Sequence, residues 1–225
     1  EAGCTVAVNA RDAAALASAA ARLGEETGGT AQPVPFDVTD RAAVTAGVRR
    51  AEELVGPLDI LVNNAGTQHR VPLLEFPDDA WYRLLDTNLT SAYLVGRAVA
   101  RGMVARGSGK IVNICSLQSE AARGDTAPYA ATKGGLKMLT RGMCADWARH
   151  GIQVNGIGPG YIETELTRPL REDPEFDAWV RRRTPAGRWG STVDIVGALR
   201  YLASPASDFV NGQILYVDGG ILAVL

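Results

Sequence analysis

The sequence lacks the features that mark membrane-spanning, secreted and nucleic-acid-binding proteins. No stretch approaches the roughly 20 apolar residues needed to cross a bilayer, and no basic segment followed by an apolar one indicates a secretory signal. The chain also has no large excess of charge of one sign, because its 23 Lys and Arg nearly balance its 25 Asp and Glu. We therefore expect neither a membrane nor a nucleic acid as a partner.

Cysteine and aromatic residues are scarce. The three cysteines are an odd number in apolar or helical contexts, which favours reduced thiols and a cytoplasmic location over a disulfide framework. We expect no metal site. With 225 residues, of which 46% are apolar, the chain is long enough to bury a core, and we expect one domain over 1–225.

Short apolar segments alternate with segments of helical periodicity along the whole chain. The expected strands are 5–9, 31–37, 59–63, 110–115, 153–158 and 214–218. The expected helices are 12–27, 40–55, 78–106, 129–150 and 192–204, with the charged run 181–183 on a solvated helix face. Strands that are apolar on both faces and alternate with helices indicate a parallel sheet covered on both sides. The fold class is α/β, a Rossmann-type doubly wound parallel sheet.

Ligands of such sheets bind beyond the carboxyl ends of the strands, so the residues there are candidates for chemistry. Ser116 follows one expected strand, and Tyr129 and Lys133 lie four residues apart at the start of a helix, on one face. Lowering a phenol pKa of about 10 by ~3 units requires roughly 4 kcal/mol, which a neighbouring ammonium can supply. We predict a proton relay in which Ser116 donates a hydrogen bond to the substrate oxygen.

A set of short motifs spread over essentially the whole chain resembles those of the short-chain dehydrogenase/reductase family. The motifs are Asn63-Asn64-Ala65-Gly66, Ser116, Tyr129 to Lys133, Pro159-Gly160 with Thr164, and Asp218-Gly219-Gly220. The resemblance implies that Tyr129 is the catalytic acid/base, that Lys133 holds the nicotinamide ribose and that Ser116 orients the substrate. It also implies that Asn88 holds a water that continues the proton path. The cofactor-binding residues that it implies are Arg11, Asp37, Val38, Asn64, Ala65, Gly66, Tyr129, Lys133, Pro159, Gly160, Ile162 and Thr164.

One motif of that family is missing. Its members open with a strand and a Thr-Gly-x-x-x-Gly-x-Gly turn that holds the cofactor pyrophosphate, and no such motif occurs in the 225 residues. Without that strand, two strand edges would be unpaired in the core. We expect the strand and turn to precede residue 1; the alternative is a pseudo-enzyme without a phosphate site.

A further set of segments resembles the branch of the family that oxidises gluconate at carbon 5. These segments are 64–70, 114–120, 137–143, 154–161 and 183–190. The resemblance implies that Arg70, Gln118 and Arg123 surround the substrate and that about 161–190 forms a small flap over it. It also implies a homotetramer, in agreement with the apolar end of the chain at 220–225, which would be exposed on a monomer.

The cofactor and the substrate class follow from charged positions. Where members that prefer NAD carry an acid, this chain has Ala10 followed by Arg11, which favours the 2′-phosphate of NADP, with NAD as the alternative. The leading hypothesis is hydride transfer between NADP(H) and a sugar acid, with the conversion of gluconate to 5-ketogluconate as the expected reaction. A reductase of a 3-oxoacyl thioester or of a deoxy-sugar acid is one alternative, and a non-catalytic cofactor-sensing module is another.

Overall fold

Six parallel strands form two sheets in the computed structural model, which describes residues 3–224. The smaller sheet pairs β1 with β2, and the larger sheet has the order β3-β4-β5-β6. The strand bounds are β1 Val6–Val8, β2 Ala31–Pro33, β3 Ile60–Asn63, β4 Gly109–Ile114, β5 Ile152–Pro159 and β6 Ile214–Val217. Residue 225, the end of the predicted apolar tail, lies outside the described residues. Among the described strands β1 and β3 do not pair with each other, so each leaves one edge unpaired.

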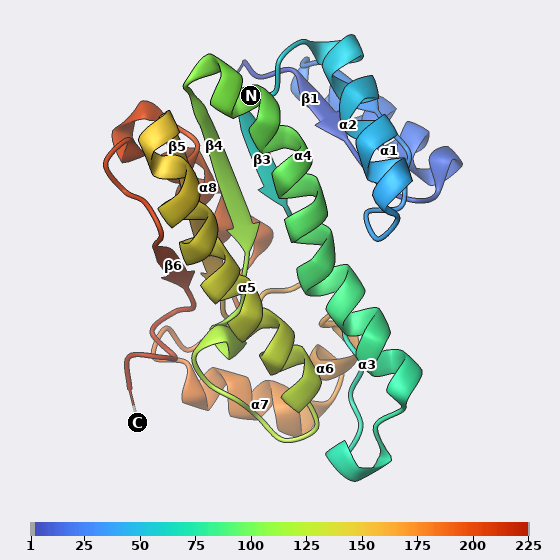
Figure 1. Cartoon of the computed structure of the whole chain (residues 1–225). Helices are drawn as coiled ribbons and strands as arrows, with labels where there is room; N and C mark the ends of the chain where they lie inside the picture. The colour runs from blue at the N-terminus through green and yellow to red at the C-terminus, as the bar shows by residue number, and fades with distance from the viewer. Residues whose placement is uncertain (1–2, 225) are drawn as a thin grey trace.

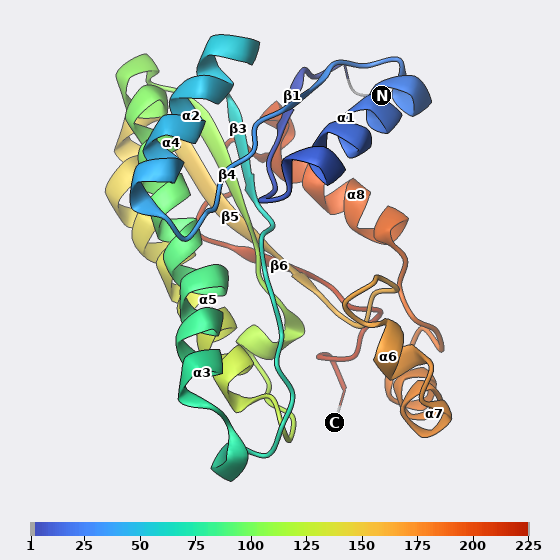
Figure 2. The ribbon, with the colours of Figure 1, turned by 90° about the vertical axis from the view of Figure 1, so that its right-hand side faces the viewer.

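Helices cover both sides of the strands (Figure 1). Their bounds are α1 Ala13–Thr27, α2 Arg41–Val55, α3 Asp78–Leu85, α4 Ser91–Arg106, α5 Ala127–Trp147, α6 Arg168–Arg171, α7 Pro174–Arg183 and α8 Thr192–Leu202. Figure 2 shows α2, α3, α4 and α5 on one side, with α1 and α8 on the other. The predicted doubly wound α/β fold is confirmed.

The helix boundaries follow from capping residues that the sequence displays. Asp12 accepts a hydrogen bond from the Ala15 N–H at 2.9 Å at the start of α1, and Asp40 accepts one from the Ala43 N–H at 2.8 Å at the start of α2. At the other end of α1, Gly28 adopts the left-handed conformation that ends many helices. These boundaries agree with the predicted ones.

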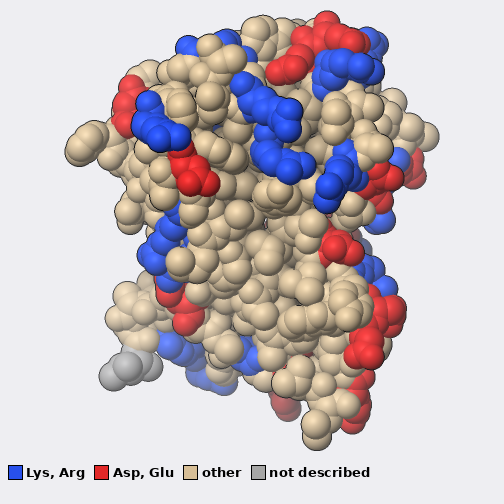
Figure 3. Space-filling model, viewed as in Figure 1, with Lys and Arg blue, Asp and Glu red and all other residues tan. Residues whose placement is uncertain are grey.

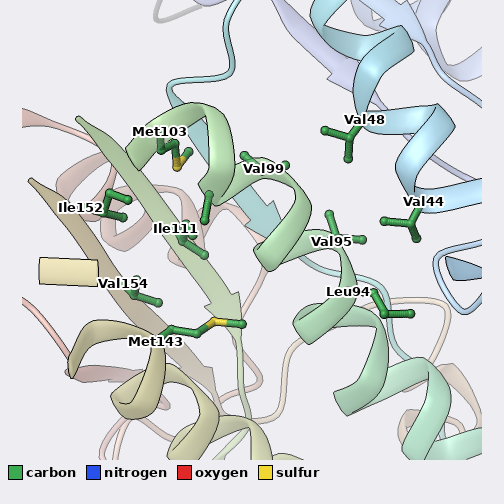
Figure 4. Packing of buried hydrophobic residues seen from close by; sticks show 11 residues of the cluster. Val44, Val48, Leu94, Val95, Val99, Met103, Ile111, Met143, Ile152 and Val154 are labelled. Atoms are coloured by element: carbon green, nitrogen blue, oxygen red, sulfur yellow. The ribbon is translucent and has the colours of Figure 1, made fainter. Parts of the chain in front are cut away.

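The main hydrophobic core lies between the larger sheet and its covering helices (Figure 4). Met103 of α4 lies on the same side of this helix as Ile111 of β4 and Val154 of β5, whereas Val95 of α4 lies toward Val44 of α2. Burying an aliphatic side chain of this size contributes about 1.5 to 3 kcal/mol. This core holds β4, β5 and α4 rigidly together, and β4 and β5 are the strands whose carboxyl ends carry most of the candidate site.

Three predicted elements differ from the observed ones. The strand expected over 31–37 ends at Pro33, although the N–H groups of Val34 and Phe36 still donate to the Val8 and Ala10 carbonyls at 2.8 Å and 3.2 Å. The single helix expected over 78–106 is divided by a π-turn over Asp86–Thr90. The last helix ends at Leu202 and not at residue 204. Helix α7 is not among the expected helices, although its last residues, 181–183, are expected on a helix face.

Three further observations concern the surface charges, the thiols and the apolar character of the helices. On the face drawn in Figure 3, cationic and anionic side chains are interspersed. Cys4, Cys115 and Cys144 are free thiols. Within residues 3–224, no helix combines the length and the apolar character that crossing a membrane would require.

Candidate active site

Strand β4 and helix α5 bring Ser116, Tyr129 and Lys133 together. Ser116 lies two residues beyond the end of β4, and Tyr129 and Lys133 occupy the first two turns of α5. The Ser116 side chain is close enough to the Tyr129 phenol to lower its pKa. The Lys133 Nζ lies 5.8 Å from the centre of the Tyr129 ring. These three side chains therefore lie at one point, as the spacing predicts.

Burial and neighbouring side chains act on the pKa of Tyr129 in opposite directions. Burial raises this pKa above its ordinary value, whereas the neighbouring Ser116 hydroxyl and the Arg70 guanidinium lower it. The buried Lys133 ammonium donates to the Ile114 carbonyl at 2.6 Å, and burial lowers the pKa of Lys133 to about 8. Arg70 is therefore a cation that favours the phenolate, and the lowering of the tyrosine pKa by Lys133 stays a prediction.

Asn88 lies within the π-turn between α3 and α4 and is fully buried. Its Oδ1 accepts from the Thr67 N–H at 2.7 Å, and its Nδ2 donates to the Thr67 carbonyl at 3.0 Å and to the Thr132 hydroxyl at 3.2 Å. The side chain therefore fastens the turn that follows β3 to helix α5. A Cβ built on Gly66 of that turn would lie 3.5 Å from the Asn88 Oδ1 and 3.9 Å from the Lys133 Nζ, so the turn passes directly beside the relay.

A buried polar ladder that the sequence did not single out aligns the strand ends. Asn63 Nδ2 donates to Asn113 Oδ1 at 2.8 Å, and Asn113 Nδ2 donates to the Thr140 hydroxyl at 2.8 Å. The ladder joins β3, β4 and α5 just below Ser116, and such satisfied buried networks fix a unique arrangement. Its available signal was an asparagine inside an otherwise apolar strand, since a buried amide needs hydrogen-bonding partners.

The residues expected to bind the cofactor lie where the strands end. Asn64, Ala65 and Gly66 are exposed immediately after β3. Gly160, next after β5, has no room for a side chain, because a Cβ there would lie 2.7 Å from the Asp218 Cα. Ile162 is buried and bridges to Gly190.

Further residues of this set lie near β1 and β2 and at the start of the flap. Arg11 is exposed just after β1. Asp37 lies after β2 and precedes Val38; hydrogen bonds from the Thr39 N–H and hydroxyl, and to a lesser extent the Arg11 charge, lower the pKa of Asp37. The Thr164 N–H donates to the Thr167 hydroxyl at 3.0 Å. A cation beyond β1, an open turn beyond β3 and a buried ammonium beside it suit the chemistry of a phosphorylated dinucleotide, so the residues present fit such a cofactor.

Arg70, Gln118 and Arg123 share a property that sets them apart from the relay. Each has a buried polar side-chain atom, respectively Nε, Oε1 and Nε, that lacks a hydrogen-bond partner within residues 3–224. Burial first, and the Arg123 charge second, lower the pKa of Arg70. Among the described residues neither guanidinium forms an ion pair with a carboxylate. Buried polar groups without partners are costly, and two neighbouring cations repel each other, so this arrangement favours an anionic ligand.

An aromatic cluster in 161–190 packs against the arginine pair. The Tyr161 ring lies 5.5 Å from the Phe176 ring and 5.5 Å from the Trp189 ring, both edge to face. The Arg123 guanidinium stacks over Phe176 at 4.8 Å from the ring centre. Helix α7 therefore lies over the arginine side of the site.

The charged run at the end of α7 is only partly a solvated face. Arg181 and Arg182 are exposed, and Arg181 pairs with Asp177 at 2.8 Å. Arg183 instead donates to the Val224 carbonyl at 2.9 Å and buries its Nη1. The prediction of a solvated face is wrong for Arg183, because the C-terminal segment folds back against it.

Comparisons with known proteins place the chain in a family. Residues 1–222 match the family described as enoyl-(acyl carrier protein) reductase. A gluconate 5-dehydrogenase of Gluconobacter oxydans (strain 621H) is 54% identical over 99% of this chain and 87% of its own length. A 5-keto-D-gluconate 5-reductase of Escherichia coli (strain K12) is 49% identical over the same shares of the two chains.

A solved structure gives the same result at the level of the fold. The crystal structure of a gluconate 5-dehydrogenase from Burkholderia cenocepacia J2315 in complex with NADP and tartrate superimposes with a TM-score of 0.96 and is 53% identical, covering 99% of this chain and 87% of that chain. Together with the juxtaposed Ser116, Tyr129 and Lys133, these similarities establish that the chain belongs to the short-chain dehydrogenase/reductase family.

Proposed function

We propose that this protein is an oxidoreductase that interconverts gluconate and 5-ketogluconate with NADP(H). The observation that carries the proposal is the pair Arg70 and Arg123, whose buried Nε atoms lack hydrogen-bond partners among residues 3–224, with the Arg70 charge acting on Tyr129. Such a pair suits a carboxylate, and the relatives named for gluconate and 5-keto-D-gluconate support the sugar acid.

The proposed chemistry divides between the relay and the cofactor. A bound nicotinamide supplies the acceptor for the hydride that leaves carbon 5. The Tyr129 phenolate takes the proton of the carbon-5 hydroxyl in oxidation, and the Tyr129 phenol returns it to the ketone oxygen in reduction. Ser116 holds the substrate oxygen by a hydrogen bond in both directions. Lys133 and a water held at Asn88 pass the proton onward.

The cofactor is proposed to be NADP, held along the carboxyl ends of the strands. Arg11 would bind the 2′-phosphate, and the turn Asn64–Gly66 together with Lys133 would hold the nicotinamide ribose. Asp37 and Val38 would lie at the adenine, and Pro159, Gly160, Ile162 and Thr164 along the nicotinamide side. The crystal structure of the Burkholderia cenocepacia relative in complex with NADP supports this choice.

The arginine pair also discriminates among the competing substrates. A 3-oxoacyl thioester would suit an open apolar groove, whereas Arg70, Gln118 and Arg123 offer charged and polar groups. A hydroxylated anion satisfies these groups, and a neutral or apolar substrate leaves them buried without partners. The geometry therefore favours a sugar acid.

A substrate panel tests the proposal. The full-length protein is assayed by nicotinamide absorbance with gluconate, 5-ketogluconate, a deoxy-sugar acid, glucose and a 3-oxoacyl thioester, each with NADP(H) and with NAD(H). We expect the highest kcat/KM for the gluconate pair with NADP(H), and glucose as a poor substrate. Best activity on the thioester would overturn the substrate, and no multiple turnover on any member of the panel would favour the cofactor-sensing alternative.

We propose further that 1–225 acts as one domain with a substrate flap at about 161–190, and that the protein is a cytoplasmic homotetramer. The free thiols support the cytoplasmic location. Exposed apolar side chains on α4 and α5, Tyr93 at 39% and Met138 at 58% exposure, support an interface along these helices. Light scattering coupled to size-exclusion chromatography measures the oligomeric state, and a monomer at micromolar concentration would contradict the tetramer.

A further inference from the structure

The segment between β4 and α5 carries most of the proposed site on an irregular stretch of backbone. Ser116, Gln118, Arg123 and Tyr129 all lie within the fourteen residues 116–129, of which only a short 3₁₀ turn, Leu117–Ser119, is regular before α5 begins. Asp125 in the same stretch has a positive φ of 62°. Such a segment has to be held by side-chain contacts if its site residues are to keep their positions.

The first of these contacts holds the beginning of the segment. The Ser119 hydroxyl accepts a hydrogen bond from the Ser116 N–H at 3.3 Å and donates one to the Lys133 carbonyl at 2.9 Å. The Ser116 hydroxyl in turn accepts from the Gln118 N–H at 3.1 Å. The turn is therefore joined to α5 at the position of the relay lysine.

The second contact is a carboxylate outside the proposed reaction. One oxygen of Glu120 receives both the Lys137 ammonium of α5 and the Tyr216 hydroxyl of β6, the latter at 2.9 Å. These two hydrogen bonds lower the pKa of Glu120, with smaller contributions from the Lys137 and Arg141 charges. The carboxylate thus stays ionised at neutral pH and joins the segment to a helix and a strand at once.

The two partners of Glu120 are themselves held in place. The Tyr216 ring packs on the backbone of β5 at Gly158, where a Cβ would lie 2.3 Å from the ring, so only glycine admits the ring there. The Lys137 side chain is 16% exposed and Lys137 lies one helical turn after Lys133. The Glu120 side chain is 41% exposed, so the contact is fixed by its two well-held partners and not by burial of the carboxylate.

We propose that Glu120 is a positioning residue, whose carboxylate, held by Lys137 and Tyr216, fixes Ser116 and Gln118 against the relay. This inference rests on the proposed function, because it assigns the polar contacts of Glu120 to substrate alignment. Glu120 lies two residues beyond Gln118 and three before Arg123, so releasing it loosens the segment on both sides. A misplacement of about 1 Å of a positioning group can cost roughly 100-fold in rate, and partial loosening costs less.

The test compares variants of Glu120 in the full-length protein. We expect Glu120→Ala to lower kcat/KM about tenfold, with a raised KM for the sugar acid and a lowered kcat, while the Kd of NADP stays within twofold. Glu120→Gln retains an oxygen that accepts from both partners and should recover most of the loss. Tyr216→Phe should lower kcat/KM by about threefold, and its effect should be less than additive with Glu120→Ala.

The matched control is Glu53→Ala, which removes an exposed glutamate that pairs with Arg49 and Arg50 on α2. This control should leave both kcat/KM and the Kd of NADP unchanged. Glu120→Ala with kcat/KM within twofold of the parent, or with equal losses in substrate and NADP binding, would overturn the proposal. If Glu120→Ala does not fold, Tyr216→Phe decides by the same criteria.

The kinetics are measured on whichever substrate of the panel the parent turns over best. A preference for a substrate other than gluconate would therefore overturn the proposed function, while the positioning role of Glu120 would still be tested by the same variants. A purely structural role would lower the melting temperature and the amount of active protein while leaving KM at the parental value, which would also overturn the proposal.

Discussion

The two halves of the candidate site differ in how completely the protein satisfies their polar groups. On the relay side, Asn88 makes three hydrogen bonds to protein atoms, and Lys133 donates to the Ile114 carbonyl. On the substrate side, Arg70, Gln118 and Arg123 each keep a buried polar atom without a partner among the described residues. Protein atoms satisfy the polar groups on the relay side, whereas those on the substrate side are available to hydrogen-bond a ligand.

The difference follows from what each half has to do. A proton relay works best when its groups are already placed, because reorganisation during the reaction raises the barrier. A specificity site gains from groups that only the correct ligand satisfies, because a wrong ligand then leaves them buried and unpaired. The proposed function thus combines a preorganised relay with an anion site that would select its ligand by hydrogen bonds left unmet without it.

The largest expected effect is on the relay side. Tyr129→Phe keeps the ring and removes the proton donor, so turnover should fall by roughly 100- to 10,000-fold, the scale of general acid–base loss. The Kd of NADP should stay unchanged, because the substitution does not alter the contacts of Lys133 and Asn88. Tyr82→Phe, at an exposed tyrosine of α3, is the matched control for loss of a hydroxyl. Turnover of Tyr129→Phe within a few-fold of the parent would show that another group moves the proton.

The next effect is on the substrate side. Arg70→Ala and Arg123→Ala should each lower kcat/KM for gluconate by roughly 10- to 100-fold, the scale of one charge-assisted hydrogen bond of about 1.5 to 3 kcal/mol. NADP affinity should barely change. Arg22→Ala on α1, where the arginine is largely exposed, controls for loss of a surface cation. If both site variants keep the parental kcat/KM, the substrate carboxylate is bound elsewhere. The buried polar atoms without partners would then not explain substrate specificity.

How much of this site the sequence predicts depends on whether a residue acts through local spacing or through tertiary contact. The i, i+4 spacing of Tyr129 and Lys133 and the strand end before Ser116 predict that these three side chains lie together, as they do. The family resemblance points to Arg70 and Arg123, whose Nε atoms have no hydrogen-bond partner among residues 3–224. The electrostatics are not predictable in this way. Arg70, 59 residues before Tyr129 in the sequence, affects its pKa, whereas Lys133, four residues away, turns its Nζ to the Ile114 carbonyl.

Features that depend on packing were missed for the same reason. The π-turn at Asn88 leaves the apolar periodicity of 78–106 intact, so a continuous helix is predicted. Arg183 looks solvated until the chain end folds onto it. The ladder through Asn113 needs three elements to be placed before its partners exist. Local patterns thus identify the elements and several side chains, whereas the tertiary structure decides which charges act on one another.

A smaller effect concerns the proposed cofactor. Arg11→Ala should lower kcat/KM for NADP(H) about tenfold and leave that for NAD(H) unchanged, because only NADP offers a phosphate for the charge-assisted contact. Arg22→Ala again serves as the control. A parent enzyme with the higher kcat/KM for NAD, or an equal loss with both cofactors, would contradict the role of Arg11.

The smallest effect, a displacement of a pH profile, joins the two halves. Oxidation needs the Tyr129 phenolate, so its rate should rise with pH through the alkaline range, because burial holds the pKa of Tyr129 above its ordinary value. Reduction needs the phenol and should fall where oxidation levels off. The Arg70 cation favours the phenolate, so Arg70→Gln should raise the pKa of Tyr129 further and move both limbs to higher pH.

Arg123→Gln is the internal control for this measurement. Its charge acts on Arg70 and Tyr161, and the groups that shift the pKa of Tyr129 are burial, Ser116, Arg70 and Cys115. At saturating substrate we therefore expect Arg123→Gln to lower the rate without moving the limbs. Equal displacement by both variants would mean that the pair acts on the phenol as one charge. No displacement by either would mean that the relay and the anion site are electrostatically independent, so that binding the carboxylate aligns the substrate without tuning the base.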